Sequence, residues 1–284
     1  MPAISHLRKE AEIILAGRYP GIDFLRPHVA QCIDLESSGW YGLFMEGSGH
    51  PDPSMPIPDY VVAFISDPEG NVLKNLKTWF PSASINIFPI FPPEENRIHI
   101  SLYMAQSIKA AGIPIDPGRC IEDSLKMPLM ADRRSFARNG GIVLHPGSGS
   151  RDKNYPPELL LEIIKRLKDR YPDRSKRIIM LLGPAEDGIL SFFREAVDQM
   201  DARLIYCPER HALMELLGQA SLYIGHDSGV THLAAMMGVP VVAIFRKSLP
   251  EKWRPLGPEV RIISDENESS DLIEDIFLSL CQGG

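Results

Sequence analysis

The sequence predicts an α/β protein made of two doubly wound domains. The chain has 284 residues, which is too long for one typical compact domain and suits two. Short apolar runs alternate with amphipathic segments along the whole chain, as in proteins that alternate strands and helices. In the second half the apolar runs are continuous, as in "IIMLLG" and "VVAIF", which is typical of parallel strands covered on both faces.

In the first half, the apolar runs predict strands at Glu12–Ala16, Gln31–Leu35, Tyr60–Ser66 and Ser84–Phe88. Helical periodicity predicts helices at Ile4–Glu10, Glu69–Phe80 and Ile98–Ala111. Two proline-rich stretches, Gly49–Asp59 and Phe88–Glu95, are predicted to be loops. Residues 112–139 have no clear period and are predicted to connect the domains. The expected domains are therefore 1–138, with the linker starting at about residue 112, and 139–284.

In the second half of the chain, predicted strands and predicted helices alternate strictly. The predicted strands are Gly141–His145, Arg177–Gly183, Arg203–Tyr206, Leu222–Gly225, Val239–Phe245 and Val260–Ile263. The predicted helices are Pro157–Tyr171, Ala185–Met200, His211–Ala220, Gly229–Met237 and Ser269–Leu280. This order predicts a doubly wound domain, and two such domains imply a ligand cleft between them. The last helix is expected to pack back on the N-terminal domain.

Composition narrows the function classes. Hydrophobic residues make up 44% and charged residues 24%, as in an ordinary globular protein. The net charge of −7 argues against nucleic acid as the main partner, although a local positive pocket can still bind an anion. The four cysteines are scattered without a C-x-x-C pair, which argues against a disulfide framework or a zinc site and favours a reducing cytosol. No apolar run reaches the about 18 residues that span a bilayer, and no signal peptide is visible.

The first candidate binding loop is "LHPGSGSRDKNYPPELL", after the strand Gly141–His145. Its glycines, Gly147 and Gly149, allow a ligand to approach the backbone, and its side-chain donors are Ser148, Ser150, Arg151 and Lys153. Such a loop before a helix is suited to an anion, and Lys153 supplies the cation that a diphosphate needs. The alternative is a plain Gly/Ser turn.

The second candidate loop, "LLGPAEDG", follows the strand Arg177–Gly183. Glu186 lies in the first turn of the next helix, where its carboxylate could accept hydrogen bonds from ribose hydroxyls. The helix dipole alone also favours an acidic residue there, so a purely structural role is the alternative.

The third loop lies within "LYIGHDSGVTHLAAMMGVPVVAIF". Asp227 or Ser228 is predicted to cap the helix that begins at Gly229, and Ser228 shares a face with His232. The free N–H groups of this helix end suit a phosphate. Asp227 would repel a diphosphate, so it must face sugar hydroxyls, a metal or Lys153. The alternative is a capping Asp with a core His; His226 is interpreted as incidental.

In that order and spacing, "HPGSGSRDKNYP", "LLGPAED" and "YIGHDSGVTHLAAMMGVPVVAIF" resemble glycosyltransferase family nine, the lipopolysaccharide heptosyltransferases. The resemblance implies a GT-B arrangement of two Rossmann-like domains with the nucleotide-sugar donor on the C-terminal one. It implies that Lys153, Ser228 and Gly229 contact donor phosphate, that Glu186 reaches the nucleoside, and that Asp227 and His232 lie by the sugar and diphosphate.

The first half departs from the family pattern. Family members begin with a strand and a Gly-rich turn resembling G-x-[LI]-G-D, whereas "MPAISHLRK" resembles the element that follows them. The N-terminal domain is therefore expected to lack its first strand, and the general-base Asp is expected upstream of Met1. A late gene start or a truncated reading frame is the expected explanation, so no catalytic residue is assigned within the chain.

The resemblance implies inverting transfer of heptose from ADP-heptose to a lipopolysaccharide inner-core acceptor. No metal or other cofactor is expected. The acceptor would be a lipid-linked saccharide at the inner membrane, and the protein would be cytoplasmic or peripheral at that membrane's inner face. Two alternatives remain: a GT-B transferase for another nucleotide-sugar, and a catalytically dead nucleotide-sugar-binding remnant.

Overall fold

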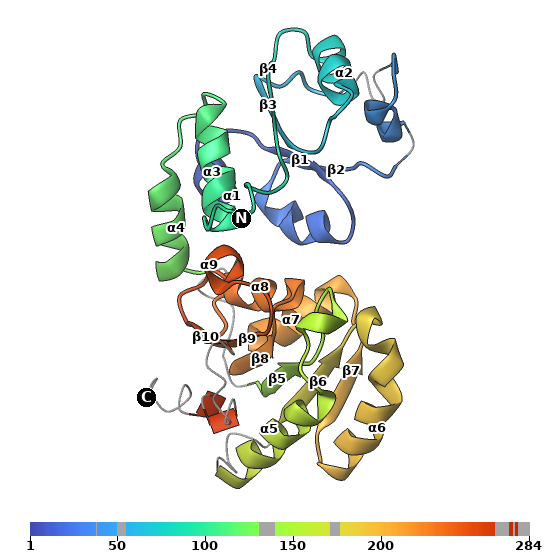
Figure 1. The fold of residues 1–284 in the computed structure, drawn as a ribbon, viewed down its shortest axis with the longest axis vertical. Helices are drawn as coiled ribbons and strands as arrows, with labels where there is room; N and C mark the ends of the chain where they lie inside the picture. The colour runs from blue at the N-terminus through green and yellow to red at the C-terminus, as the bar shows by residue number, and fades with distance from the viewer. Residues whose placement is uncertain are drawn as a thin grey trace. The chain divides into compact units, whose positions relative to one another are not determined.

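The computed structural model describes residues 1–37, 39–49, 55–130, 140–170, 177–264, 273–274 and 276–277. The chain divides into two compact units, Met1–Asp123 (unit 1) and Ser124–Gly284 (unit 2). Figure 1 shows both units, coloured along the chain. The division falls inside the segment 112–139 that the sequence predicts to connect the domains, before the predicted boundary at residue 138.

Unit 1 contains two small parallel sheets. Strand β1 (Ile14–Gly17) pairs with β2 (Gln31–Asp34), and β3 (Tyr60–Phe64) pairs with β4 (Ser84–Phe88). The helical elements are α1 (Pro2–Leu7), η1 (Gly21–His28), η2 (Trp40–Phe44), α2 (Asn71–Trp79) and α3 (Ile100–Ala110). All four predicted strands form, as do the two longer predicted helices. The helix predicted at Ile4–Glu10 begins earlier, at Pro2, whose fixed φ suits a first helical turn.

The two small sheets share one hydrophobic core. Ile33 of β2 packs with Val72, Leu76 and Trp79 of α2, and side chains of β3 and β4 contact the same cluster. Trp79 meets Trp40 of η2 edge-to-face, with ring centroids 6.0 Å apart. Unit 1 therefore has a core of its own.

The predicted irregular segment 112–139 contains a helix, which corrects the prediction. Helix α4 runs from Pro117 to Lys126. Asp116 accepts a hydrogen bond from the N–H of Arg119 at 3.0 Å, which is the geometry of an N-cap, and Pro117 follows it at the first helical position. The sequence signal for the start of this helix is the pair Asp116–Pro117. The buried positions of the helix, Pro117, Cys120 and Ser124, recur at helical spacing, but none of them carries a large apolar side chain.

Unit 2 is built on a six-stranded parallel sheet in the order β10-β9-β8-β5-β6-β7, which can be followed across Figure 1. The strands are β5 (Ile142–His145), β6 (Ile178–Leu182), β7 (Arg203–Tyr206), β8 (Leu222–His226), β9 (Val241–Phe245) and β10 (Val260–Ser264). The helical elements are η3 (Arg151–Lys153), α5 (Pro157–Arg170), η5 (Pro184–Ile189), α6 (Leu190–Gln199), α7 (Arg210–Gln219), α8 (Gly229–Met236) and α9 (Pro250–Trp253). All six predicted strands are confirmed. The single helix predicted at Ala185–Met200 is two elements, η5 and α6.

Helices cover both faces of this sheet, as continuous apolar strands require. On one face, α5 and α6 pack on alternate strand residues such as Leu144, Met180 and Ile224. On the other face, α8 contacts β8 and β9. Every residue of β5 and β9 is buried. Most of the last predicted helix, Ser269–Leu280, lies outside the described residues, although Ile276 and Phe277 join the core of unit 2.

The strand order creates a switch point. From β5 the chain moves outward through β6 and β7, and then crosses back to β8 on the other side of β5. Strands β5 and β8 pair directly, with His145 opposite Gly225. The segments that leave β5 and β8 therefore diverge at their carboxyl ends, where open α/β sheets bind ligands. No helix in the described part of the chain is long and apolar enough to cross a membrane.

Candidate functional site

The candidate site of unit 2 lies at the switch point, between residues 146–155 (the β5 loop) and the start of α8. The ammonium of Lys153 lies 2.9 Å from Asp227 Oδ2, and His232 Nε2 lies 3.5 Å from Asp227 Oδ1. The Asp227 side chain is 8% exposed, whereas Lys153 and His232 are 36% and 31% exposed. The structure thus places a buried carboxylate between two half-exposed nitrogen groups, and Lys153 is the partner of Asp227.

Asp227 is ionised at neutral pH. Burial acts to raise the pKa of its carboxyl group, but donors that include His232 and Lys153 outweigh burial and lower the pKa to about 2. In this structure the Lys153 ammonium is therefore neutralised by Asp227. A phosphate that binds Lys153 must share it with this carboxylate.

The start of α8 presents backbone donors beside this ion pair. Ser228 is the N-cap, and its Oγ accepts a hydrogen bond from the N–H of Thr231 at 3.3 Å. Thr231 is fully buried and bonds the carbonyl of His226 at 2.5 Å, which holds the helix end on β8. Gly229 is exposed, and a Cβ built on it would meet no atom within 4 Å. The first turn is therefore open to an anion at Gly229.

The β5 loop is braced from within. The hydroxyl of Ser148 donates to the carbonyl of Ser150 at 2.7 Å and accepts from the N–H of Ser150 at 3.3 Å. Ser148 is buried, while Gly149 and Ser150 are exposed. Ser150 and Gly149 thus offer the open surface of the loop, and Ser148 shapes it.

Glu186 lies in η5, the element that follows β6, and packs against the β5 loop. It is 3% exposed, and its Oε2 accepts the N–H of Gly183 at 2.6 Å, which caps η5. A Cβ on Gly147 would lie only 1.7 Å from Glu186 Oε1. The glycine at residue 147 is therefore required by Glu186, whereas the sequence suggested close approach of a ligand. A Cβ on Gly149 would meet nothing within 4 Å.

His226, interpreted as incidental from the sequence, holds two backbone groups of the β5 loop in the structure. It is fully buried at the end of β8. Its Nδ1 lies 2.8 Å from the carbonyl of Pro146, and its Nε2 accepts the N–H of Tyr155 at 3.0 Å. Burial, with the charges of His145 and Arg246, lowers the pKa of His226 to about 4, although the Pro146 carbonyl opposes this. The ring is therefore neutral at pH 7.

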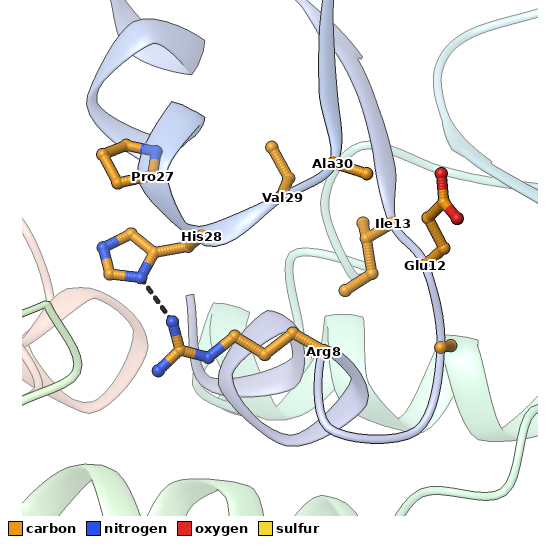
Figure 2. Close-up of a pocket in the computed structure, with 8 residues that line it drawn as sticks. Arg8, Glu12, Ile13, Pro27, His28, Val29 and Ala30 are labelled. Atoms are coloured by element: carbon orange, nitrogen blue, oxygen red, sulfur yellow. Dashed lines mark hydrogen bonds between the residues drawn. The ribbon is translucent and has the colours of Figure 1, made fainter.

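Unit 1 has a shallow pocket of about 280 Å³ that includes Arg8, Glu12 and His28. Figure 2 shows the Arg8 guanidinium directed at His28, whose Nδ1 accepts its hydrogen bond at 2.7 Å. Burial and the Arg8 charge lower the pKa of His28. The pocket lies beside Ile13 and Ala30, which precede β1 and β2. It is therefore at the amino ends of these strands, away from the edge where α/β sheets bind ligands.

A doubly wound parallel sheet whose switch point holds a lysine, an exposed helix N-terminus and polar loops is typical of a nucleotide-binding α/β protein. Comparison with known families is more specific. The model of glycosyltransferase family 9 (heptosyltransferase) matches residues 98–275. The chain belongs to this family, as its motifs suggested.

A curated relative, lipopolysaccharide heptosyltransferase 1 of Campylobacter coli, is 28% identical over 131 residues. The match covers 44% of this chain and 37% of that relative, so it spans little more than a third of the relative's length.

Solved structures resemble the whole chain. A family 9 glycosyltransferase from Veillonella parvula aligns with a TM-score of 0.64 at 15% identity, covering 99% of this chain and 84% of that one. The E. coli heptosyltransferase WaaC, solved with ADP, aligns with a TM-score of 0.64 at 11% identity, covering 100% and 94%. The E. coli ADP-heptose lipopolysaccharide heptosyltransferase II aligns with a TM-score of 0.59 at 16% identity, covering 100% of this chain and 96% of that one. These matches confirm the predicted α/β fold class of GT-B glycosyltransferases.

Proposed function

We propose that this protein transfers a heptose from ADP-heptose to a lipopolysaccharide inner-core acceptor, with inversion at the anomeric carbon. Membership of family 9 supports heptosyl transfer, and two structural neighbours are described with ADP or ADP-heptose in their names. The acceptor would be a lipid-linked saccharide, reached at the cytoplasmic face of the inner membrane.

The observation that carries the proposal is the pairing of Lys153 with Asp227 beside the exposed N-terminus of α8. In the proposed complex, Lys153, Ser150 and the N–H groups at Ser228 and Gly229 contact the donor diphosphate. Asp227 and His232 face the sugar, whose hydroxyls can donate to the carboxylate. Glu186 lies next to the nucleoside in this proposal, where its carboxylate can accept hydrogen bonds from ribose hydroxyls while Oε2 also accepts the N–H of Gly183.

The chemistry follows from charge. The acceptor hydroxyl gives its proton to a general base and attacks the anomeric carbon, the bond from that carbon to the diphosphate oxygen breaks, and ADP leaves with the electron pair. Negative charge grows on the leaving diphosphate as the bond breaks. A lysine and a helix N-terminus that are already in place stabilise this charge without reorganisation, which is an electrostatic contribution to the transition state.

The test is donor binding by Lys153→Ala. We expect the affinity for ADP, measured by isothermal titration calorimetry, to fall at least about tenfold, because a charge-assisted contact to phosphate is lost. The unfolding midpoint should change little, since Lys153 is partly exposed. Lys168→Ala is the matched control: it removes the same charge from the end of α5, where Lys168 lies 3.9 Å from Asp201.

Unchanged ADP affinity in Lys153→Ala would remove Lys153 from the donor site. A panel of ADP-, UDP- and GDP-sugars tests the nucleotide, and stronger binding of a UDP- or GDP-sugar would favour a different transferase of the same fold. Binding of the ADP-sugar without transfer to any lipopolysaccharide core acceptor would favour a nucleotide-sugar-binding protein without activity.

A further inference from the structure

His226 connects both ends of the β5 loop to the sheet. Pro146 begins this loop and Tyr155 ends it, and the loop carries Ser150 and Lys153 between them. One imidazole ring contacts both ends, through Pro146 O at 2.8 Å and Tyr155 N at 3.0 Å. The next residue after His226 is Asp227, which contacts Lys153 at 2.9 Å. The position of Lys153 relative to Asp227 is therefore linked to the geometry of this ring.

The two partners determine the tautomer of His226. A backbone N–H can only donate, so Nε2 must accept from Tyr155 and carries no proton. The ring proton then lies on Nδ1, which donates to the carbonyl of Pro146. The neutral ring uses both nitrogens. Because His226 is fully buried, water cannot replace either bond, and loss of the ring leaves polar backbone groups without a partner.

A second side chain holds the same end of the loop. Nη1 of Arg246, the residue that follows β9, donates to the carbonyl of Asn154 at 2.6 Å. The Arg246 guanidinium lies 5.2 Å from the centre of the Tyr155 ring, and this ring is stacked near that of His226, with centroids 5.9 Å apart. Residues at the ends of β8 and β9 thus hold Asn154 and Tyr155, directly after Lys153.

From this geometry we infer that His226, assisted by Arg246, is a positioning residue that holds the β5 loop so that Lys153 meets the donor diphosphate. The inference rests on the proposed function, because it assumes that Lys153 binds donor phosphate. Neither His226 nor Arg246 contacts the ligand in this proposal. They act through the loop, and a phosphate contact is sensitive to displacements of about 1 Å.

Two substitutions separate the two bonds of His226. His226→Asn keeps an N–H donor near the Nδ1 position, which can bond Pro146, but it removes the acceptor for Tyr155. His226→Gln keeps an acceptor near the Nε2 position and loses the bond to Pro146. Since Tyr155 lies two residues from Lys153, we expect the Asn variant to lose about tenfold in ADP affinity. We expect the Gln variant to lose less.

The same variants are measured by amide hydrogen exchange without nucleotide. We expect faster exchange in the peptide that covers residues 146–155, and the increase should be larger for His226→Asn than for His226→Gln. Arg246→Met keeps a long side chain at this position but removes both the guanidinium over the Tyr155 ring and the bond to Asn154. Like His226→Asn, it should make exchange in residues 146–155 faster and ADP binding weaker. It does so without a change to the buried His226 side chain.

Ile164→Val is the control for a general loss of stability. Ile164 is fully buried in the core of unit 2 and lies on α5, outside the β5 loop. Suppose that Ile164→Val has the same unfolding midpoint as His226→Asn and also loses as much ADP affinity. The loss of affinity is then an effect of reduced fold stability, and the positioning role is wrong. Unchanged loop exchange and unchanged ADP affinity in both His226 variants would also overturn it.

Failure of the proposed function gives a different result. If the unmodified protein binds no ADP, UDP or GDP, the donor assignment fails while the exchange experiment still decides whether His226 holds the loop. If ADP binds and Lys153→Ala weakens it, but the His226 and Arg246 variants do not, the proposed function stands and the positioning role is rejected.

Discussion

Asp227 is a charged group whose position in the crevice opposes the binding of an anion. Its carboxylate is ionised, nearly buried and 2.9 Å from the Lys153 ammonium. A diphosphate that approaches Lys153 meets this negative charge at short range, where the low local dielectric strengthens repulsion. The carboxylate is therefore unfavourable for binding free ADP. We attribute its presence to the sugar of the proposed donor, whose hydroxyls can donate to it.

This explanation predicts an unusual gain of affinity. Asp227→Asn removes the negative charge at nearly constant side-chain volume and frees the Lys153 ammonium for phosphate. We expect ADP to bind about fivefold more tightly, a change of roughly 1 kcal/mol, and transfer from the sugar donor to slow. Calorimetric titration of ADP at low and high salt measures the effect, which should shrink as salt screens the partly exposed Lys153.

Asp201→Asn is the matched control, since the Asp201 carboxylate is fully exposed near Lys168. It removes one negative charge from the protein without changing the crevice, so ADP affinity should stay the same. Weaker ADP binding in Asp227→Asn would mean that the carboxylate mainly orients Lys153, and the repulsion argument would be wrong.

The sequence predicted the ionic part of the site but missed the backbone contacts. A carboxylate beside a phosphate-binding loop needs a cation or hydroxyls, so Lys153 could be named as a partner of Asp227 from charge alone. His226 could not be assigned in this way, because its partners are a carbonyl and an amide located 80 and 71 residues earlier in the chain. Every residue has such groups, so they leave no signature in the sequence.

Among the elements, the β5 loop depends on a contact with η5. Gly147 packs against the carboxylate of Glu186, which is buried and cannot turn away while Oε2 accepts the N–H of Gly183. Two neighbouring glycines therefore have different roles: Gly147 fits the loop against η5, and Gly149 faces open space. The alternation of Gly and Ser in "PGSGS" does not reveal this difference.

The two glycines give a matched pair of substitutions. Gly147→Ala places a methyl group into the Glu186 carboxylate, and we expect it to lower the free energy of unfolding of unit 2 by about 1–3 kcal/mol. Gly149→Ala meets no atom within 4 Å and should be neutral or slightly stabilising, by at most about 1 kcal/mol. Urea unfolding monitored by circular dichroism measures both. Equal midpoints for the two variants would contradict the role of Glu186 in shaping the loop.

Regular elements were predicted well where apolar periodicity is strong. Strand β9 was predicted within two residues of its observed bounds, because a buried strand of a parallel sheet is a continuous apolar run. The edge strand β7 was predicted with its observed bounds, Arg203–Tyr206, although its end residues are exposed. Helix α4 was missed because its buried face includes Ser124 and Cys120. The short helices η1 and η2 were missed because 3₁₀ turns have no long period.

For the molecule as a whole, the described residues of each unit include a hydrophobic core. The core around Ile33, Val72 and Trp79 belongs to unit 1, and the core around Leu144, Ile164 and Phe193 belongs to unit 2. The Lys153–Asp227 pair and the start of α8 belong to unit 2. A ligand bound at this site should therefore stabilise unit 2 directly.

Differential scanning calorimetry can test this separation. Leu76→Ala removes a buried side chain from the core of unit 1, and Ile164→Ala does so in unit 2; each should cost about 2–5 kcal/mol in its own unit. ADP at a hundred times its dissociation constant adds about 2.7 kcal/mol to the unit that binds it. We expect ADP to raise the temperature of the transition that Ile164→Ala lowers, which is that of unit 2. The temperature of the transition that Leu76→Ala lowers should not change with ADP. A single transition that both variants lower and ADP raises would show that the two cores unfold as one cooperative unit.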